Sequence, residues 1–106
     1  YVEVKNVTLI DGSIARFPDA VTSRGLKHLG ELTTMVASGS RAMMCYLIQR
    51  SDAHSFEPAD EIDPAYAQGL RDAMSKGVEA VAWVCEVTPI SIRVSRSVPV
   101  NLDRTP

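Results

Sequence analysis

The sequence predicts an α/β domain in which helices flank a mixed β-sheet, with elements in the order β, α, β, α, β, β. Two observations support this fold class. Nearly unbroken apolar runs at 41–49 and 78–88 have the length and composition of buried strands. Before each run lies a longer stretch with helical spacing of apolar residues and a capping residue at its start.

The first element is a strand over Tyr1–Ile10, in which apolar and polar residues alternate. The apolar positions change from Val2 and Val4 to Val7 and Leu9, so the strand switches faces around positions 5 and 6. This switch indicates a β-bulge. A turn is expected at 11–13, and residues 14–17 are expected to form a short extended return before a proline.

A helix is predicted to begin with Thr22 or Ser23 as its N-cap and to run to about Ala37, before a serine–glycine pair. At about 100° per residue, leucine and valine side chains fill one side of it. The opposite side carries a narrow polar stripe, formed by Arg24, Lys27, His28 and Glu31. The stripe has two interpretations: a solvated face with an internal ion pair, or one wall of a functional site.

The apolar run Arg41–Gln49 predicts a central strand that is covered on both faces. The polar stretch Arg50–Glu61 predicts a surface loop. It contains His54 and several acidic residues, but their spacing fits no closed metal site.

Asp63 as N-cap and Pro64 at the first helical position predict the start of a second helix, which ends near Gly77. A mostly buried strand follows over 78–88. Residues 90–95 alternate between apolar and polar, as expected of a half-exposed edge strand, and Pro99 limits pairing beyond it.

Length and composition limit the classes of function. A chain of 106 residues is one domain with a modest core, and a net charge of −2 creates no overall basic field for nucleic acid. Cys45 and Cys85 lie within apolar runs, so we expect small buried side chains rather than a disulfide or metal pair. Reduced cysteines, with no apparent signal peptide or membrane span, predict a cytoplasmic protein.

A carboxylate and a lysine lie two residues apart on the first strand. Residues two apart point to the same face, so Glu3 and Lys5 project together while Val2 and Val4 point to the other side. A strand-borne acid-x-Lys pair is the core of one widespread metal-dependent nuclease site. By itself, the triplet is better explained as a solvated strand edge with an ion pair.

The wider stretch resembles the bacterial sugar fermentation stimulation protein family. The resemblance is carried by Val2–Leu9, Phe17–Gly25, Lys27–Leu29 and Glu31–Leu32, and it continues more weakly to Val98–Leu102. It implies that residues 1–106 are the C-terminal domain of the family's longer protein, whose N-terminal domain precedes this chain. It also implies a restriction-endonuclease-like PD-(D/E)XK core.

The resemblance also implies roles for particular residues. In such folds one carboxylate ends the preceding strand and the next comes from the acid-x-Lys strand. Glu3 corresponds to the second carboxylate and Lys5 to the lysine, and these two are the expected catalytic residues. Asp19 is the expected additional oxygen ligand, so Glu3 and Asp19 would hold Mg²⁺. The first carboxylate would lie upstream of Tyr1.

The family resemblance further implies DNA binding without strong sequence preference and a regulatory link to sugar (maltose) use. The residues expected to contact DNA are Lys5, Arg16, Arg24, Lys27 and His28. Four acidic residues lie in the same stretch, so the local charge is balanced and binding should be weak and salt-sensitive. No aromatic platform beside paired carboxylates indicates a sugar site.

Three functions stay open at this point. The first is a non-specific DNA-binding domain within a larger regulator. The second is a metal-dependent nuclease whose first carboxylate lies upstream of this chain. The third is a structural or dimerising domain with a relic of the site, which would make the protein a homo-oligomer. An Arg-x-Asp-like run just before Tyr1 would favour the enzyme.

Overall fold

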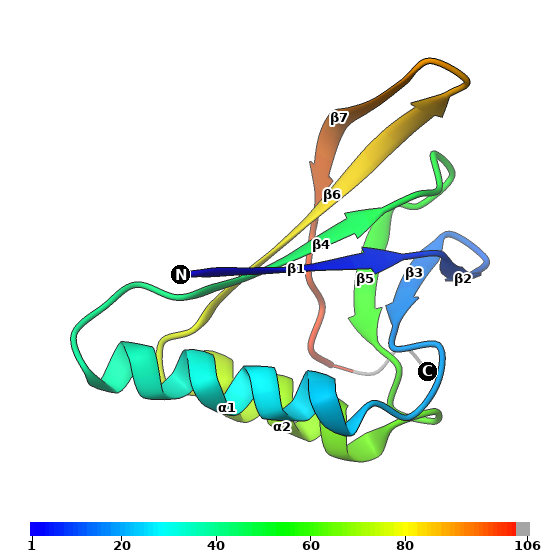
Figure 1. Cartoon of the computed structure of the whole chain (residues 1–106). Helices are drawn as coiled ribbons and strands as arrows, with labels where there is room; N and C mark the ends of the chain where they lie inside the picture. Colours follow the sequence, from blue (N-terminus) through cyan, green and yellow to red (C-terminus); the bar gives the residue numbers. More distant parts are fainter. Residues whose placement is uncertain (104–106) are drawn as a thin grey trace.

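The computed structural model describes residues 1–103. The described chain forms two helices, α1 (Ser23–Ala37) and α2 (Pro64–Ser75), and the strands β1 (Val2–Val7), β2 (Leu9–Asp11), β3 (Ile14–Phe17), β4 (Met43–Ile48), β5 (Ser55–Pro58), β6 (Glu79–Thr88) and β7 (Ser91–Val98) (Figure 1). The predicted class, a mixed α/β fold with two helices, is confirmed. The predicted order of six elements is incomplete, because the structure adds β2, β3 and β5; only for β3 did the sequence indicate a short extended segment.

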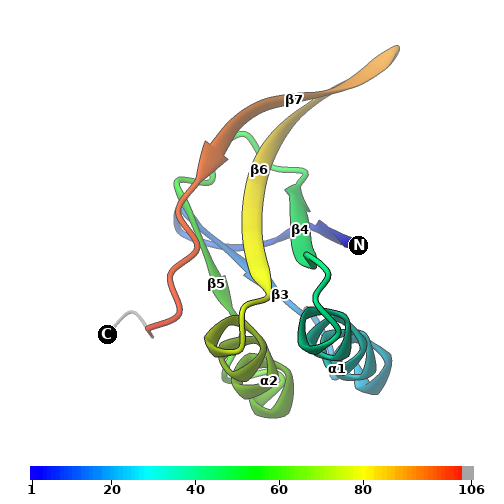
Figure 2. The same cartoon turned by 90° about the vertical axis from the view of Figure 1, so that its left-hand side faces the viewer.

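The larger sheet has the strand order β1-β4-β6-β7, in which β1, β4 and β6 are parallel and β7 is antiparallel. Both helices lie on the same side of this sheet (Figure 2). Along β4 the side chains facing the helices are buried, whereas the alternate ones are only partly buried. The prediction that this strand is covered on both faces is therefore wrong for the described chain.

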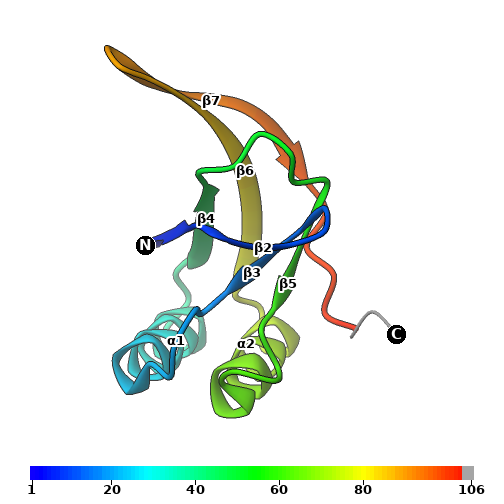
Figure 3. The ribbon, with the colours of Figure 1, turned by 90° about the vertical axis from the view of Figure 1, so that its right-hand side faces the viewer.

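The smaller sheet has the order β2-β3-β5 (Figure 3). It corrects two predictions. The stretch Tyr1–Ile10 is not one bulged strand: β1 pairs with β4 in the larger sheet, and β2 turns back on β3 in the smaller one. The change in apolar positions marks this passage between sheets. The predicted loop Arg50–Glu61 contains β5, which pairs in parallel with β3.

Both helices begin at the predicted capping residues. The Thr22 side chain accepts a hydrogen bond from the backbone N–H of Gly25, and Asp63 accepts one from Tyr66. Asp63 also accepts a bond from the backbone N–H of Thr22 at 2.8 Å, so one carboxylate joins the two helix starts. A side chain at Gly69 would come within 2.5 Å of a leucine of α1, so glycine permits the helices to pack closely.

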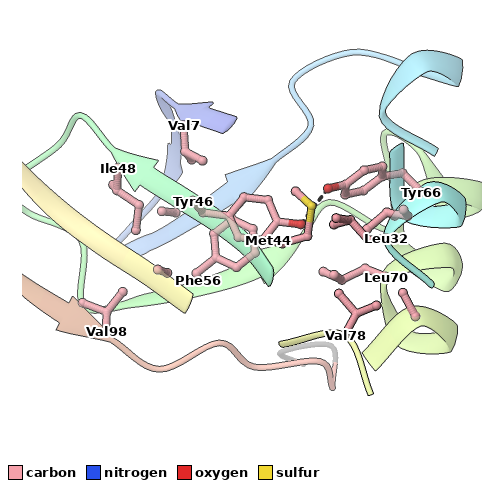
Figure 4. Close-up of a cluster of buried hydrophobic side chains, with 14 of the residues drawn as sticks. Val7, Leu32, Met44, Tyr46, Ile48, Phe56, Tyr66, Leu70, Val78 and Val98 are labelled. Carbon is pink, nitrogen blue, oxygen red and sulfur yellow. Dashed lines mark hydrogen bonds between the residues drawn. The ribbon is translucent and has the colours of Figure 1, made fainter. Parts of the chain in front are cut away.

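The core lies between the two sheets and the helices, and its largest members are aromatic (Figure 4). Tyr46 of β4 stacks on Phe56 of β5, with ring centroids 4.2 Å apart. The hydroxyls of Tyr46 and Tyr66 lie 2.6 Å apart, and neither residue is exposed to solvent. Burying two hydroxyls is tolerable because each satisfies the other.

Both cysteines are free thiols; Cys85 is buried, as predicted, whereas Cys45 is only partly buried. Burial raises the pKa of each thiol. Of the helices in residues 1–103, neither is long and apolar enough to cross a membrane.

Candidate functional site: an acid–lysine–histidine cluster at the sheet edge

The acid-x-Lys pair lies on β1, the edge strand of the larger sheet. Glu3 and Lys5 lie on the same face of β1, as predicted, and their contacts with His28 show that this face is turned toward α1. Val2 and Val4 point to the opposite face and are 61% and 50% exposed. The polar pair therefore faces the protein, opposite His28 of α1, and the valines face outward.

His28 of α1 completes a compact ionic cluster with these two residues. Its Nδ1 lies 3.0 Å from Nζ of Lys5 and 3.1 Å from Oε1 of Glu3. The ammonium and the carboxylate are 3.5 Å apart. The side chains of Lys5 and His28 are each only 17% exposed, and that of Glu3 is 34% exposed. The predicted meeting of the strand pair with the helix stripe therefore occurs through His28.

The cluster lies close to the aromatic part of the core. Lys5 is the register partner of Tyr46 on β4, and the Phe17 ring packs edge-on against Tyr66, with centroids 5.3 Å apart. The pKa of Tyr66 is raised to about 12: burial raises it most, the hydrogen bond with Tyr46 lowers it, and the charges of Asp63 and Glu3 raise it. The hydroxyl is thus a neutral neighbour of the Glu3 carboxylate at ordinary pH.

Arg24 and Lys27 are exposed on the same turns of α1 that carry His28. They add positive charge beside the cluster at the solvent-facing side of the helix. Their exposure leaves them accessible to a ligand, in contrast to His28, whose ring is engaged by Lys5 and Glu3.

Arg16 of β3 is the remaining cation expected to contact DNA, and it is surrounded by acidic side chains from other parts of the chain. Its guanidinium lies 2.8 Å from Glu61, 3.7 Å from Asp11 and 3.9 Å from Glu57, and the residue is only 9% exposed. Three carboxylates outweigh its charge. Arg16 is thus engaged in ion pairs within the protein and is not accessible to a ligand.

The assignment of Glu3 and Asp19 as metal ligands stays a prediction. Asp19 is exposed in the segment before α1. Within residues 1–103, no group of three histidine, cysteine, aspartate or glutamate side chains is arranged to hold a metal ion. Asp19 therefore does not join Glu3 and His28 in a common ligand set. The histidine of the predicted surface loop, His54, is exposed, as expected.

Two features near the site escaped the sequence analysis. The hydroxyl pair of Tyr46 and Tyr66 was not foreseen, because Tyr66 reads simply as an apolar position of α2. Glu57 is 2% exposed, although it lies in a polar stretch that is typical of a surface loop. Its partner, Arg16, is distant in sequence, so no local pattern signals the burial.

The fold and the cluster define a class of protein: a mixed α/β domain with an acid-x-Lys pair on an edge strand and a histidine from the first helix directly above it. Residues 1–91 match the family described as "Sugar fermentation stimulation protein RE domain". The chain belongs to this family.

Curated relatives support the assignment. The sugar fermentation stimulation protein homologue of Geobacter metallireducens is 54% identical over 102 residues, which cover 96% of this chain and 44% of the relative. The homologue of Rhodospirillum centenum is 57% identical over 98 residues, covering 92% of this chain and 42% of the relative. The chain thus spans less than half the length of these relatives.

A solved structure has the same fold. The structure of Pyrococcus furiosus SfsA in complex with Ca²⁺ superposes with a TM-score of 0.88 at 30% sequence identity. The match covers 94% of this chain and 44% of that chain.

Proposed function

We propose that this chain is a non-specific DNA-binding domain of a larger protein that regulates sugar (maltose) metabolism, and that it contacts phosphates through Lys5, Arg24 and Lys27. The observation that carries the proposal is the position of the Lys5 ammonium. It has three N–H donors, of which His28 and Glu3 engage at most two. The third is available to a phosphate oxygen at the partly exposed edge of the sheet, beside two exposed cations of α1.

The balance of charges in the chain should make this binding weak. The net charge of the chain is −2, and Glu3 lies within 3.5 Å of the central lysine. Phosphate contacts release counterions whatever the base sequence, so the affinity depends on salt but not on sequence. Arg16 is left out of the proposed surface because its guanidinium is surrounded by carboxylates.

A triple substitution of Lys5, Arg24 and Lys27 to alanine tests the proposal. Fluorescence-anisotropy titration of a random-sequence duplex at low salt should show weaker binding, with a salt slope lower by about 0.9 for each lost contact. The matched control removes three exposed arginines elsewhere, each with an acidic partner: Arg41, Arg50 and Arg93. Both variants change the net charge equally. Equal affinities for the two variants would refute the proposed surface.

A second candidate function is metal-dependent cleavage of nucleic acid, favoured by the acid-x-Lys pair on β1. The relative from Pyrococcus furiosus was solved in complex with Ca²⁺, a cation that takes oxygen ligands. The described residues of this chain do not fit such a cation by themselves, because Glu3 is the only carboxylate of the cluster. Further ligands would have to come from the rest of the protein.

We therefore expect this 106-residue chain to show no appreciable Mg²⁺- or Mn²⁺-dependent cleavage of plasmid DNA. In a full-length protein that does cleave, Glu3→Ala and Lys5→Ala should each abolish activity and leave the fold intact. Robust nicking by the 106-residue chain would show that the cluster is a complete site. Absence of both DNA binding and cleavage in the full-length protein would instead favour a structural or dimerising domain.

A further inference from the structure

We propose that His28 is a positioning residue: its Nδ1 accepts a hydrogen bond from the Lys5 ammonium and so fixes the direction in which this group points, beside its ion-pair partner Glu3. The distances carry the argument. Lys5 Nζ is 3.0 Å from Nδ1 of His28 but 3.5 Å from Oε1 of Glu3. The first lies within the range of a hydrogen bond and the second beyond it.

The geometry also assigns the tautomer of the imidazole. Nδ1 is close to both Lys5 and Glu3, but one ring nitrogen cannot accept from an ammonium and donate to a carboxylate at once. An ammonium can only donate and a carboxylate can only accept, so the two contacts require opposite tautomers. The Lys5 contact is the one with hydrogen-bond geometry, and on this ground we assign Nδ1 as the acceptor and place the ring proton of the neutral imidazole on Nε2.

This arrangement has a consequence for the ligand-binding surface. A lysine side chain is long and has considerable rotamer freedom, so without His28 the ammonium would move to the adjacent carboxylate. A Lys5–Glu3 hydrogen bond would point the ammonium toward the carboxylate and away from a phosphate. With His28 as the acceptor, Glu3 stays an ion-pair partner at 3.5 Å and a further N–H of Lys5 is left for the proposed phosphate contact.

The helix that carries His28 is held firmly in place. Thr22 caps its start and donates its own N–H to Asp63 of the second helix. One turn before His28, a side chain on Gly25 would come within 2.8 Å of Thr22 and 3.1 Å of Tyr66. Close contact at this turn fixes α1 against α2, and a rigid helix is what positioning of a site residue requires.

Nuclear magnetic resonance of the imidazole nitrogens tests the tautomer directly, at mildly alkaline pH. The expected result is protonated Nε2 and unprotonated Nδ1 in the parent protein. In Lys5→Met, which keeps the side-chain length but removes the donor, Nδ1 should gain its proton and donate to Glu3. A parent protein with the proton on Nδ1, or a tautomer unaffected by Lys5→Met, would overturn the proposal. These measurements need no ligand, so they are independent of the proposed function.

A second measurement rests on the proposed function and uses DNA binding. His28→Leu keeps much of the side-chain volume without an acceptor, and we expect it to weaken duplex binding roughly tenfold, as Lys5→Met does. His28→Asn places an amide oxygen near the position of Nδ1 and should restore most of the affinity. The double variant of Lys5 and His28 should bind no more weakly than Lys5→Met alone. Additive losses, or failure of asparagine to restore binding in a folded variant, would contradict the positioning role.

Discussion

The buried hydroxyl pair of Tyr46 and Tyr66 gives a prediction that can be worked out in detail. The two oxygens are 2.6 Å apart in a site from which solvent is excluded. Replacing one tyrosine by phenylalanine removes the hydrogen bond and leaves the other hydroxyl buried without that partner. Such a group costs about 1–3 kcal/mol of stability, so Tyr46→Phe and Tyr66→Phe should each lower the free energy of unfolding by that amount.

The double variant removes both hydroxyls and leaves no unsatisfied group. Its loss of stability should be well below the sum of the two single losses, with a coupling energy of about 1–2 kcal/mol. Urea unfolding followed by circular dichroism, with unchanged m-values, measures all three variants. Additive losses would mean that the hydroxyls do not satisfy each other, and the reasoning would fail.

The same pair predicts a dependence of stability on alkaline pH. Burial raises the pKa of Tyr66 from its ordinary 10.0 to about 12, and it raises that of Tyr46 as well. The folded protein thus holds these protons more tightly than the unfolded chain. Their contribution is complete below pH 10 and is lost as the pH rises toward 12, with Tyr66 alone accounting for roughly 3 kcal/mol. The double phenylalanine variant is the control, because it should lack this component of the pH dependence. If the free energies of unfolding of parent and control ran parallel between pH 9 and 12, the predicted role of the tyrosine pair would be refuted.

Two other predictions concern glycine and cysteine. Gly25→Ala should destabilise the protein by about 1–3 kcal/mol in urea unfolding, because the new methyl group would meet Thr22 at 2.8 Å. Gly30→Ala in the same helix meets nothing within 4 Å and should be neutral or stabilising by up to about 1 kcal/mol; a similar loss for both would refute the contact argument. Since burial raises the pKa of the Cys45 and Cys85 thiols, both should react much more slowly with a disulfide reagent at neutral pH than in the unfolded chain. Equal rates in the folded and unfolded chains would show that burial does not protect them.

The sequence alone determined the features that depend on near neighbours. Both helices begin at the predicted caps, Thr22 and Asp63, because a capping side chain bonds to the backbone three residues away. Glu3 and Lys5 share a face because successive residues of any strand alternate. The two β-strands with nearly unbroken apolar runs were equally apparent, and so was the helix stripe that contains His28.

Only the tertiary structure decided the features that depend on distant partners. The passage from β1 to β2 between two sheets, the added strand β5 and the burial of Glu57 beside Arg16 all require pairing across many residues. The close contact of Lys5 with His28, 23 residues apart, has the same origin. Helical periodicity predicts the side of α1 on which a residue lies, but not how closely that side approaches a strand. The position of α1 depends on tertiary contacts with α2, through packing at Gly25 and the carboxylate of Asp63 that joins the two helix starts.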